Sequence, residues 1–264
     1  MTVKYYDWME YQSNFRPEKI AIKEISSGKE LSYKTLNDRS KALAGWLQKN
    51  GIEKGDRVAI LSHNCAEVFE LEFACGKIGG IELPLNWRLT KPELEYILKD
   101  SSPKVLIYSI EFKEVAEALL KDCDIKNSLG IEENNFSSSY ESAISENNDF
   151  TSIECTHDDL IMLMYTSGTT GHPKGAMITH RMQFFNIVNL ASTARITDKA
   201  VQLVSLPLFH TGGMNCYANP VLHNGGQIIL TKEFDPGKAL EIINDPDYGV
   251  THLFAVPAPY QFMM

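Results

Sequence analysis

Apolar positions along the chain recur with two spacings, one typical of helices and one typical of buried strands. Between residues 35 and 50, Leu43 and Leu47 belong to an apolar set with helical spacing. Gly51 follows and tolerates the left-handed conformation that commonly ends a helix. Residues 57–62 form a short continuous apolar run instead, which indicates a buried strand. The first 60 residues therefore predict a helix followed by a strand.

The same two patterns continue to the end of the chain. Further helices are expected at residues 64–77, 90–99, 179–194, 214–223 and 236–244, and further strands at residues 104–108, 158–165, 201–206, 227–231 and 250–256. Residues 132–151 are mostly Glu, Asn, Ser and Asp, so we expect a surface excursion there. Alternating strands and helices favour an α/β fold with layered, mainly parallel sheets covered by helices.

Composition and charge narrow the class of protein. A chain of 264 residues allows one large domain or two smaller ones. Its net charge of −9 argues against nucleic-acid binding, which needs a dense basic surface. No apolar run is long enough to cross a bilayer, so no membrane span is expected. Five cysteines without a CxxC pair predict a reduced, cytoplasmic protein without a metal site.

One segment combines the residues that bind phosphate groups. Residues 165–175 read Tyr-Thr-Ser-Gly-Thr-Thr-Gly-His-Pro-Lys-Gly and lie between an expected strand and an expected helix. Glycines let backbone amides approach a ligand, hydroxyls donate and accept hydrogen bonds, and Lys174 adds a mobile positive charge. These features favour a polyphosphate ligand. The alternative is a polar turn without a ligand, since Gly, Ser and Thr are common in turns.

Two common interpretations of such a loop do not fit the residues. A Walker A loop that begins at Gly168 requires glycine where Pro173 stands, and Ser or Thr where Gly175 stands. The chain also lacks the Gly-x-Ser-x-Gly elbow of α/β-hydrolases. The sequence therefore disfavours an ordinary P-loop enzyme and a serine hydrolase.

Residues 165–175 instead resemble the phosphate loop of the AMP-forming adenylate family. This family includes acyl-CoA synthetases, aryl-CoA ligases, luciferases and carrier-loading adenylation domains. Residues 83–90 are similar to its Pro-Leu-Asn-x-Arg-Leu-Thr stretch, which is most typical of the CoA ligases, and residues 205–213 and 250–257 are similar to two later motifs. The resemblance implies the incomplete N-terminal domain of such an enzyme, with residues about 1–60 and 201–264 in one sheet subdomain and about 61–200 in the other.

The resemblance also implies a reaction and its binding residues. Family members use MgATP to convert a carboxylic acid to an acyl-adenylate, and the CoA ligases then form a thioester with coenzyme A. The residues that would bind the β- and γ-phosphates are Thr166, Ser167, Gly168, Thr169, Thr170, Gly171 and Lys174. His210 and Gly212 match positions that line the acyl pocket, although a lone histidine is more often structural. No residue is assigned as catalytic or as a metal ligand.

Several family segments are missing from the 264 residues. There is no Tyr-Gly-x-Thr-Glu segment, no Thr-Gly-Asp segment and no C-terminal lid domain. We therefore expect that this chain alone does not complete adenylation. The apolar residues 253–264 add the expectation of a homo-oligomer formed through that end. A noncatalytic assembly or nucleotide-binding fragment, a carrier-loading adenylation domain and a luciferase-like oxidase remain alternatives, and fatty and aryl acids both remain open as substrates.

Overall fold

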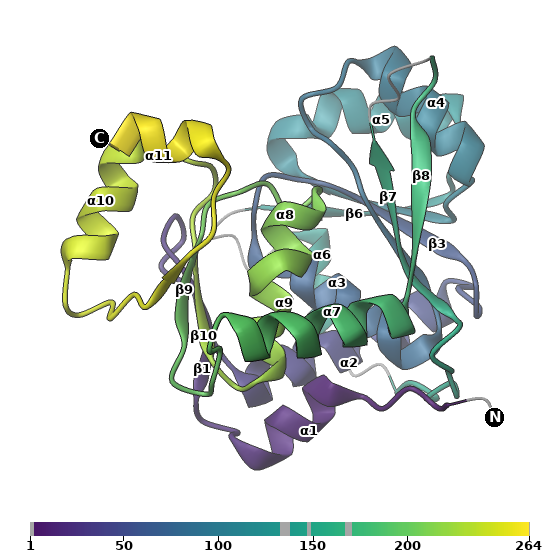
Figure 1. Ribbon diagram of the computed structural model, residues 1–264. Helices are drawn as coiled ribbons and strands as arrows, with labels where there is room; N and C mark the ends of the chain where they lie inside the picture. The colour runs from purple at the N-terminus through teal and green to yellow at the C-terminus, as the bar shows by residue number, and fades with distance from the viewer. Residues whose placement is uncertain (1–2, 133–137, 147–148, 167–170, 264) are drawn as a thin grey trace. The chain divides into compact units, whose positions relative to one another are not determined.

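The expected alternation of strands and helices is confirmed in the computed structural model, which describes residues 3–132, 138–146, 149–166 and 171–263 (Figure 1). The described residues group into two compact units. The first consists of Met1–Asp7, Asp38–Ser62 and Val68–Arg181, and the second of Trp8–Asn37, His63–Glu67 and Met182–Met264. Three of the five unit limits fall within helices, namely α2 (Tyr33–Lys49), α3 (Ala66–Ile78) and α7 (His180–Thr193).

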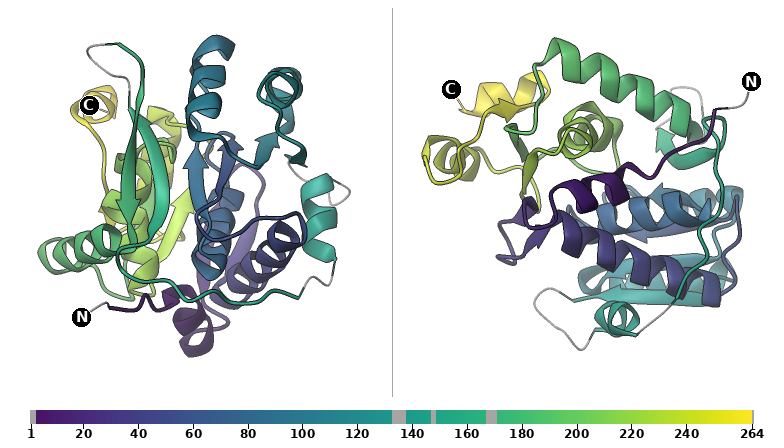
Figure 2. Two further views of the ribbon diagram at one scale, coloured as in Figure 1. Left: turned by 90° about the vertical axis from the view of Figure 1, so that its right-hand side faces the viewer. Right: turned by 90° about the horizontal axis from the view of Figure 1, so that it is seen from below.

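The described strands of the first unit form one six-stranded sheet. In chain order they are β3 (Arg57–Leu61), β4 (Ile81–Pro84), β5 (Val105–Ser109), β6 (Asn127–Ile131), β7 (Leu160–Thr166) and β8 (Lys174–Thr179). Their order in the sheet is β6-β5-β3-β4-β7-β8. All neighbours are parallel except β7 and β8, which form the antiparallel hairpin drawn in green in the left view of Figure 2.

Two helices cover one face of this sheet, and a hydrophobic core lies between them and the strands. They are α4 (Lys91–Ser101) and α5 (Lys113–Asp122), which lie side by side (Figure 1). The buried side chains between these helices and the strands include Leu61, Leu83, Leu98, Leu106 and Leu119. The start of α4 is fixed by a capping box formed by Thr90 and Glu93. A short helix, η1 (Ile110–Phe112), precedes α5.

In the second unit, the described strands form a five-stranded sheet. They are β1 (Ile20–Glu24), β2 (Glu30–Ser32), β9 (Val201–Val204), β10 (Gln227–Leu230) and β11 (His252–Leu253), in the sheet order β11-β9-β10-β1-β2. Only β2 is antiparallel to its described neighbour. The described helices that lie entirely in this unit are α1 (Trp8–Phe15), α8 (Thr211–Gly213), η2 (Met214–Ala218), α9 (Asn219–His223), α10 (Pro236–Asn244) and α11 (Pro257–Met263), and most of α7 also belongs to it.

The acidic segment at residues 132–151 is not only a surface excursion, so that prediction is wrong for its central part. Residues Ser139–Ser145 form helix α6, and Tyr140 is fully buried. The hydroxyl of Tyr140 donates a hydrogen bond of 2.7 Å to Glu70. Burial of one aromatic ring, with a partner for its polar end, stabilises this helix although the surrounding sequence is polar.

Three further structural findings concern the compartment, metal and membrane expectations. The five cysteines, all within the described ranges, are free thiols. Among the residues that the structure describes, no group of three or more His, Cys, Asp and Glu side chains could hold a metal ion. None of the helices in the described ranges combines the length and the apolar character that a membrane span requires.

Candidate functional site

The candidate phosphate-binding segment connects two antiparallel strands. Tyr165 and Thr166 are the last residues of β7, and Lys174 and Gly175 are the first residues of β8. The helix expected at residues 179–194 is confirmed as α7 (His180–Thr193), but the strand β8, which includes the end of the segment and leads to α7, was not expected. Antiparallel pairing with the buried strand β7 supplies the hydrogen bonds that hold β8 extended.

The structure places the two ends of the candidate loop opposite one another. Thr166 and Lys174 form the last register pair of the hairpin, and both are exposed. Gly171 has a φ of 140°, a conformation that favours glycine. Ser167, Gly168, Thr169 and Thr170 lie outside the described residues. The described part therefore brings one hydroxyl and one ammonium group to the same end of the hairpin.

The side chain of Lys174 is exposed and available to a ligand. Within the described ranges, no ion pair of its ammonium group is found. Lys77 of the same unit offers a contrast, because its buried ammonium lies 2.6 Å from Asp7. A lysine held in this way is already neutralised, whereas an exposed lysine retains its charge for an anion. The geometry at Lys174 is compatible with a phosphate group.

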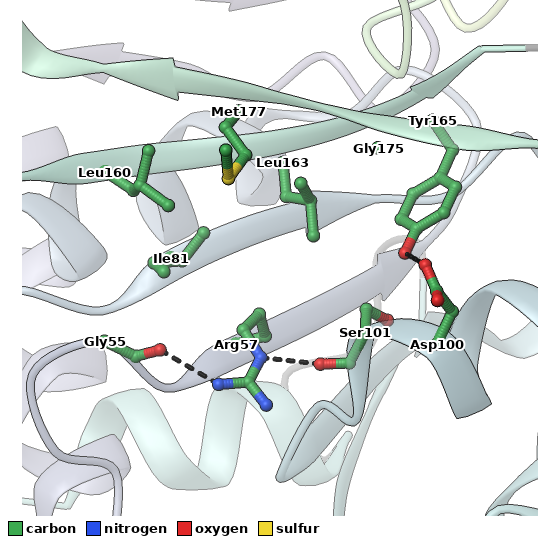
Figure 3. A pocket seen from close by; sticks show the side chains of 10 residues that line it. All are labelled: Gly55, Arg57, Ile81, Asp100, Ser101, Leu160, Leu163, Tyr165, Gly175 and Met177. Carbon is green, nitrogen blue, oxygen red and sulfur yellow. Dashed lines mark hydrogen bonds between the residues drawn. The ribbon is translucent and has the colours of Figure 1, made fainter.

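A cavity of about 460 Å³ lies against the root of the hairpin (Figure 3). Its lining residues are Gly55, Arg57, Ile81, Asp100, Ser101, Leu160, Leu163, Tyr165, Gly175 and Met177. Three donor nitrogens of Arg57 bond to backbone carbonyls of Gly55, Ser101 and Ser102, at 2.6–3.0 Å. On the opposite wall, the hydroxyl of Tyr165 donates a hydrogen bond of 2.5 Å to Asp100.

Burial also affects the acidity of Tyr165. It raises the pKa of the phenol above its usual value, and the hydrogen bond to the Asp100 carboxylate raises it further. The phenol is therefore a stable donor, and Asp100 is a suitable acceptor for it. The local sequence does not single out Asp100, because its partner lies 65 residues away in the chain.

His210 and Gly212, the other candidates, belong to the second unit. The backbone N–H of Gly212 donates a hydrogen bond of 3.1 Å to Nδ1 of His210, which is the N-cap of α8. His210 therefore has a local structural role, which is the common alternative for a lone histidine. Its ring is exposed, so this role leaves an accessible side chain beside Gly212.

Apolar side chains surround Gly212. A Cβ atom at this position would lie 3.7 Å from both Leu206 and Phe254. The ring of Phe254 is stacked on Tyr217, with centroids 5.2 Å apart. Phe254 was expected only as part of a strand, at residues 250–256, and nothing in its local sequence indicated contact with the Gly212 segment. The second unit thus places two aromatic rings beside the candidate acyl-pocket residues.

Comparison with known proteins gives consistent matches along the chain. The family described as AMP-binding enzyme matches residues 9–264. A feruloyl-CoA synthase from Amycolatopsis is 36% identical and covers 96% of this chain. The long-chain-fatty-acid–CoA ligase FadD13 of Mycobacterium tuberculosis is 32% identical and covers 99%. The chain spans about half the length of these curated relatives, 49% and 51% respectively.

Solved structures agree with the sequence matches. The ATP-bound structure of MatB from Rhodopseudomonas palustris superposes with a TM-score of 0.86 at 30% identity. The match covers 97% of this chain and 50% of that chain. The arrangement of strands and helices described above is therefore shared with solved proteins over nearly all of the present chain.

Proposed function

Because the chain belongs to the AMP-binding enzyme family, we propose that it serves the ATP-dependent activation of a carboxylic acid and its transfer to coenzyme A. A carboxylate is a poor electrophile. Attack of its oxygen on the α-phosphorus of ATP forms an acyl-adenylate and breaks the bond to the β-phosphate, which releases pyrophosphate. The thiol of coenzyme A then attacks the acyl carbon, and AMP leaves with the carboxylate oxygen.

The observation that carries this proposal is the exposed Lys174 ammonium opposite Thr166 at the end of the hairpin. A triphosphate needs positive charge and hydrogen-bond donors at such a place. We propose that Thr166, Ser167, Gly168, Thr169, Thr170, Gly171 and Lys174 bind the β- and γ-phosphates. In the reaction, Lys174 would stabilise the negative charge that develops on the departing pyrophosphate. Mg²⁺ would be held mainly by the phosphate oxygens, since Mg²⁺ commonly binds with its substrate phosphates.

We propose that residues of the second unit bind the acyl group. His210 and Gly212 would line its pocket, and the neighbouring rings of Phe254 and Tyr217 favour an apolar or aromatic acid. The names of the two curated relatives include one aryl acid and one long-chain fatty acid. We therefore propose the class of aryl or fatty carboxylic acids.

Two measurements test this function. Calorimetric titration of the 264-residue chain with MgATP should give saturable 1:1 binding, and absence of binding would contradict the proposal. Pyrophosphate release is then measured with aryl acids, fatty acids and coenzyme A. We expect turnover far below that of a full-length ligase, because the chain spans about half of its relatives. Thioester formation only on a phosphopantetheine carrier protein would favour the carrier-loading alternative.

Exposed apolar side chains favour a second proposal, self-association of the chain. Val256, Tyr260 and Phe262 are 51%, 42% and 71% exposed. All three lie within seven consecutive residues, and exposed apolar side chains favour association. Light scattering of the wild type and of Phe262→Ser tests this. A dimer that dissociates in the variant supports association, and a monomeric wild type contradicts it.

A further inference from the structure

The outer half of the β7–β8 hairpin has little support from the rest of its sheet. In the described part of the sheet, β7 pairs with β4 through a single register pair, Glu82 with Met162. The hairpin ladder continues four residues further, to Thr166 and Lys174. β8 is the edge strand of the described sheet. An isolated two-stranded ribbon is only marginally stable in water, so this half needs other contacts.

The cavity described above borders this ribbon. Its walls include Leu163, Tyr165, Gly175 and Met177 on the ribbon, and Ile81 on β4 (Figure 3). On β7, Met164 is buried and Leu163 and Tyr165 pack against the core of the first unit, whereas Met177 on β8 is 64% exposed. Packing therefore fixes β8 less firmly than a buried strand, and specific side-chain contacts near the end of the ribbon add support.

Helix α4 supplies two such contacts. Asp100 accepts the 2.5 Å hydrogen bond from Tyr165, directly before the last residue of β7. The ring of Tyr96 stacks on His172, with centroids 4.5 Å apart and an angle of 15° between the planes. Residues 96 and 100 are four positions apart and therefore lie on the same helix face. One helix thus contacts the candidate segment at two points, at Tyr165 before Thr166 and at His172 before Lys174.

The helix itself is well anchored. Its first turn is closed by the Thr90–Glu93 capping box, and Leu94, Ile97 and Leu98 are buried in the core of the first unit. A contact to α4 is therefore a contact to the rigid part of the unit. A small movement of Tyr165 or His172 would also move the nearby phosphate-binding groups of Thr166 and Lys174. Such a movement would weaken binding, because effective binding requires donors in fixed positions.

We propose that Tyr96 and Asp100 are positioning residues that hold the β7–β8 hairpin in the conformation that binds triphosphate. The inference rests on the proposed function of the loop. Tyr165 and His172 are the hairpin residues through which Tyr96 and Asp100 act. None of the four is assigned to contact the nucleotide.

The test uses the 264-residue chain and four single variants. Tyr96→Ala removes the ring stack, Tyr96→Phe retains it, and Tyr165→Phe removes the hydrogen bond while keeping the ring. Lys99→Ala is the matched control on α4, because its 57% exposed ammonium pairs with Glu95 of the same helix. Hydrogen exchange is followed in peptides that cover β7 and β8, and MgATP affinity is measured by calorimetry.

We expect Tyr96→Ala and Tyr165→Phe each to accelerate exchange in β7 and β8 and to weaken MgATP binding by about tenfold. Tyr96→Phe and Lys99→Ala should match the wild type, and exchange in β3 and β5 should be unchanged in all four variants. This local pattern distinguishes positioning from general destabilisation. Unchanged exchange in β7 and β8 of both disruptive variants would overturn the proposal, as would an equal loss in Tyr96→Phe.

The same experiment distinguishes an error in the proposed function of the loop from an error in the positioning role. If the wild type binds no MgATP, the function assigned to the loop is wrong. Accelerated exchange in Tyr96→Ala and Tyr165→Phe would then still support anchoring of the hairpin by α4. Normal exchange in these variants would overturn the anchoring as well.

Discussion

Replacement of Arg39 by methionine is expected to destabilise the first unit strongly. Nε of Arg39 donates a hydrogen bond of 2.6 Å to Glu70, whose side chain is completely buried. Its two terminal nitrogens bond to the carboxylate of Glu141 on α6, at 2.7 and 2.9 Å. Burial opposes the charge of Arg39, but the Glu70 and Glu141 carboxylates outweigh it and raise the pKa of the guanidinium.

The expected loss of stability follows from the buried Glu70 carboxylate, which loses its charged partner in this variant. Removal of one partner from a buried ion pair leaves an uncompensated charge and costs about 3–5 kcal/mol. Tyr140 still donates one hydrogen bond to Glu70, so the lower part of this range is expected. For a chain of this size, the loss corresponds to a decrease of about 6–12 °C in the midpoint of thermal unfolding.

The assay is thermal and urea unfolding followed by circular dichroism. Lys49→Met is the matched control, because Lys49 lies on the same helix, α2, and pairs with Glu146 at the end of α6. That pair is 66% and 53% exposed, so its loss should change the free energy of unfolding by less than about 1 kcal/mol. Equal stability losses in the two variants would show that burial of the ion pair does not decide the effect.

Three further changes test other features of the fold, each by urea unfolding. Burial and the nearby Glu72 raise the pKa of Glu82, so the free energy of unfolding should fall as pH rises above the usual carboxyl range. Glu82→Gln should raise the free energy of unfolding at pH 8 by about 2 kcal/mol. A variant with the pH dependence of the wild type would contradict this. Burial lowers the pKa of His180 from 6.5 to about 4. The folded state therefore favours neutral His180, and stability should fall by about 3 kcal/mol between pH 6.5 and 4. His180→Phe preserves the ring stack on Tyr5 and should remove most of this loss, whereas an unchanged profile would exclude His180 as its source. The Cβ of Gly213→Ala would overlap the carbonyl oxygen of Pro207 and lie 2.7 Å from that of Leu206, which should cost at least about 2 kcal/mol. Gly212→Ala, with its nearest contact at 3.4 Å, should unfold like the wild type.

Elements with local signals were predictable from the sequence. The capping box at Thr90 and Glu93 and the glycine at residue 51 mark helix limits that the structure confirms within two residues. Helix α6 was missed because it depends on burial of Tyr140 beside Glu70, which is 70 positions away. Strand β8 was missed because it is a largely exposed edge strand without a long apolar run, and pairing with β7 keeps it extended.

The residues of the candidate site also differ in whether the local sequence identifies them. Lys174 and Thr166 are recognisable from their immediate neighbours in the sequence. Tyr96 and Asp100 are not, since each contacts a residue more than 60 positions away. Phe254 also contacts the Gly212 segment only after the second unit has folded. The assigned binding roles of Lys174, Thr166, His210 and Gly212 stay predictions.

The most direct test of the account compares MgATP binding by the wild-type chain and by Lys174→Ala. Calorimetric titrations are run under identical ionic conditions, with Lys126→Ala, an exposed lysine of the same unit, as the control. Loss of a charge-assisted bond to phosphate should weaken binding at least about tenfold in Lys174→Ala, and Lys126→Ala should leave it unchanged. Equal affinities of the wild type and Lys174→Ala would contradict the claim that this hairpin binds the triphosphate.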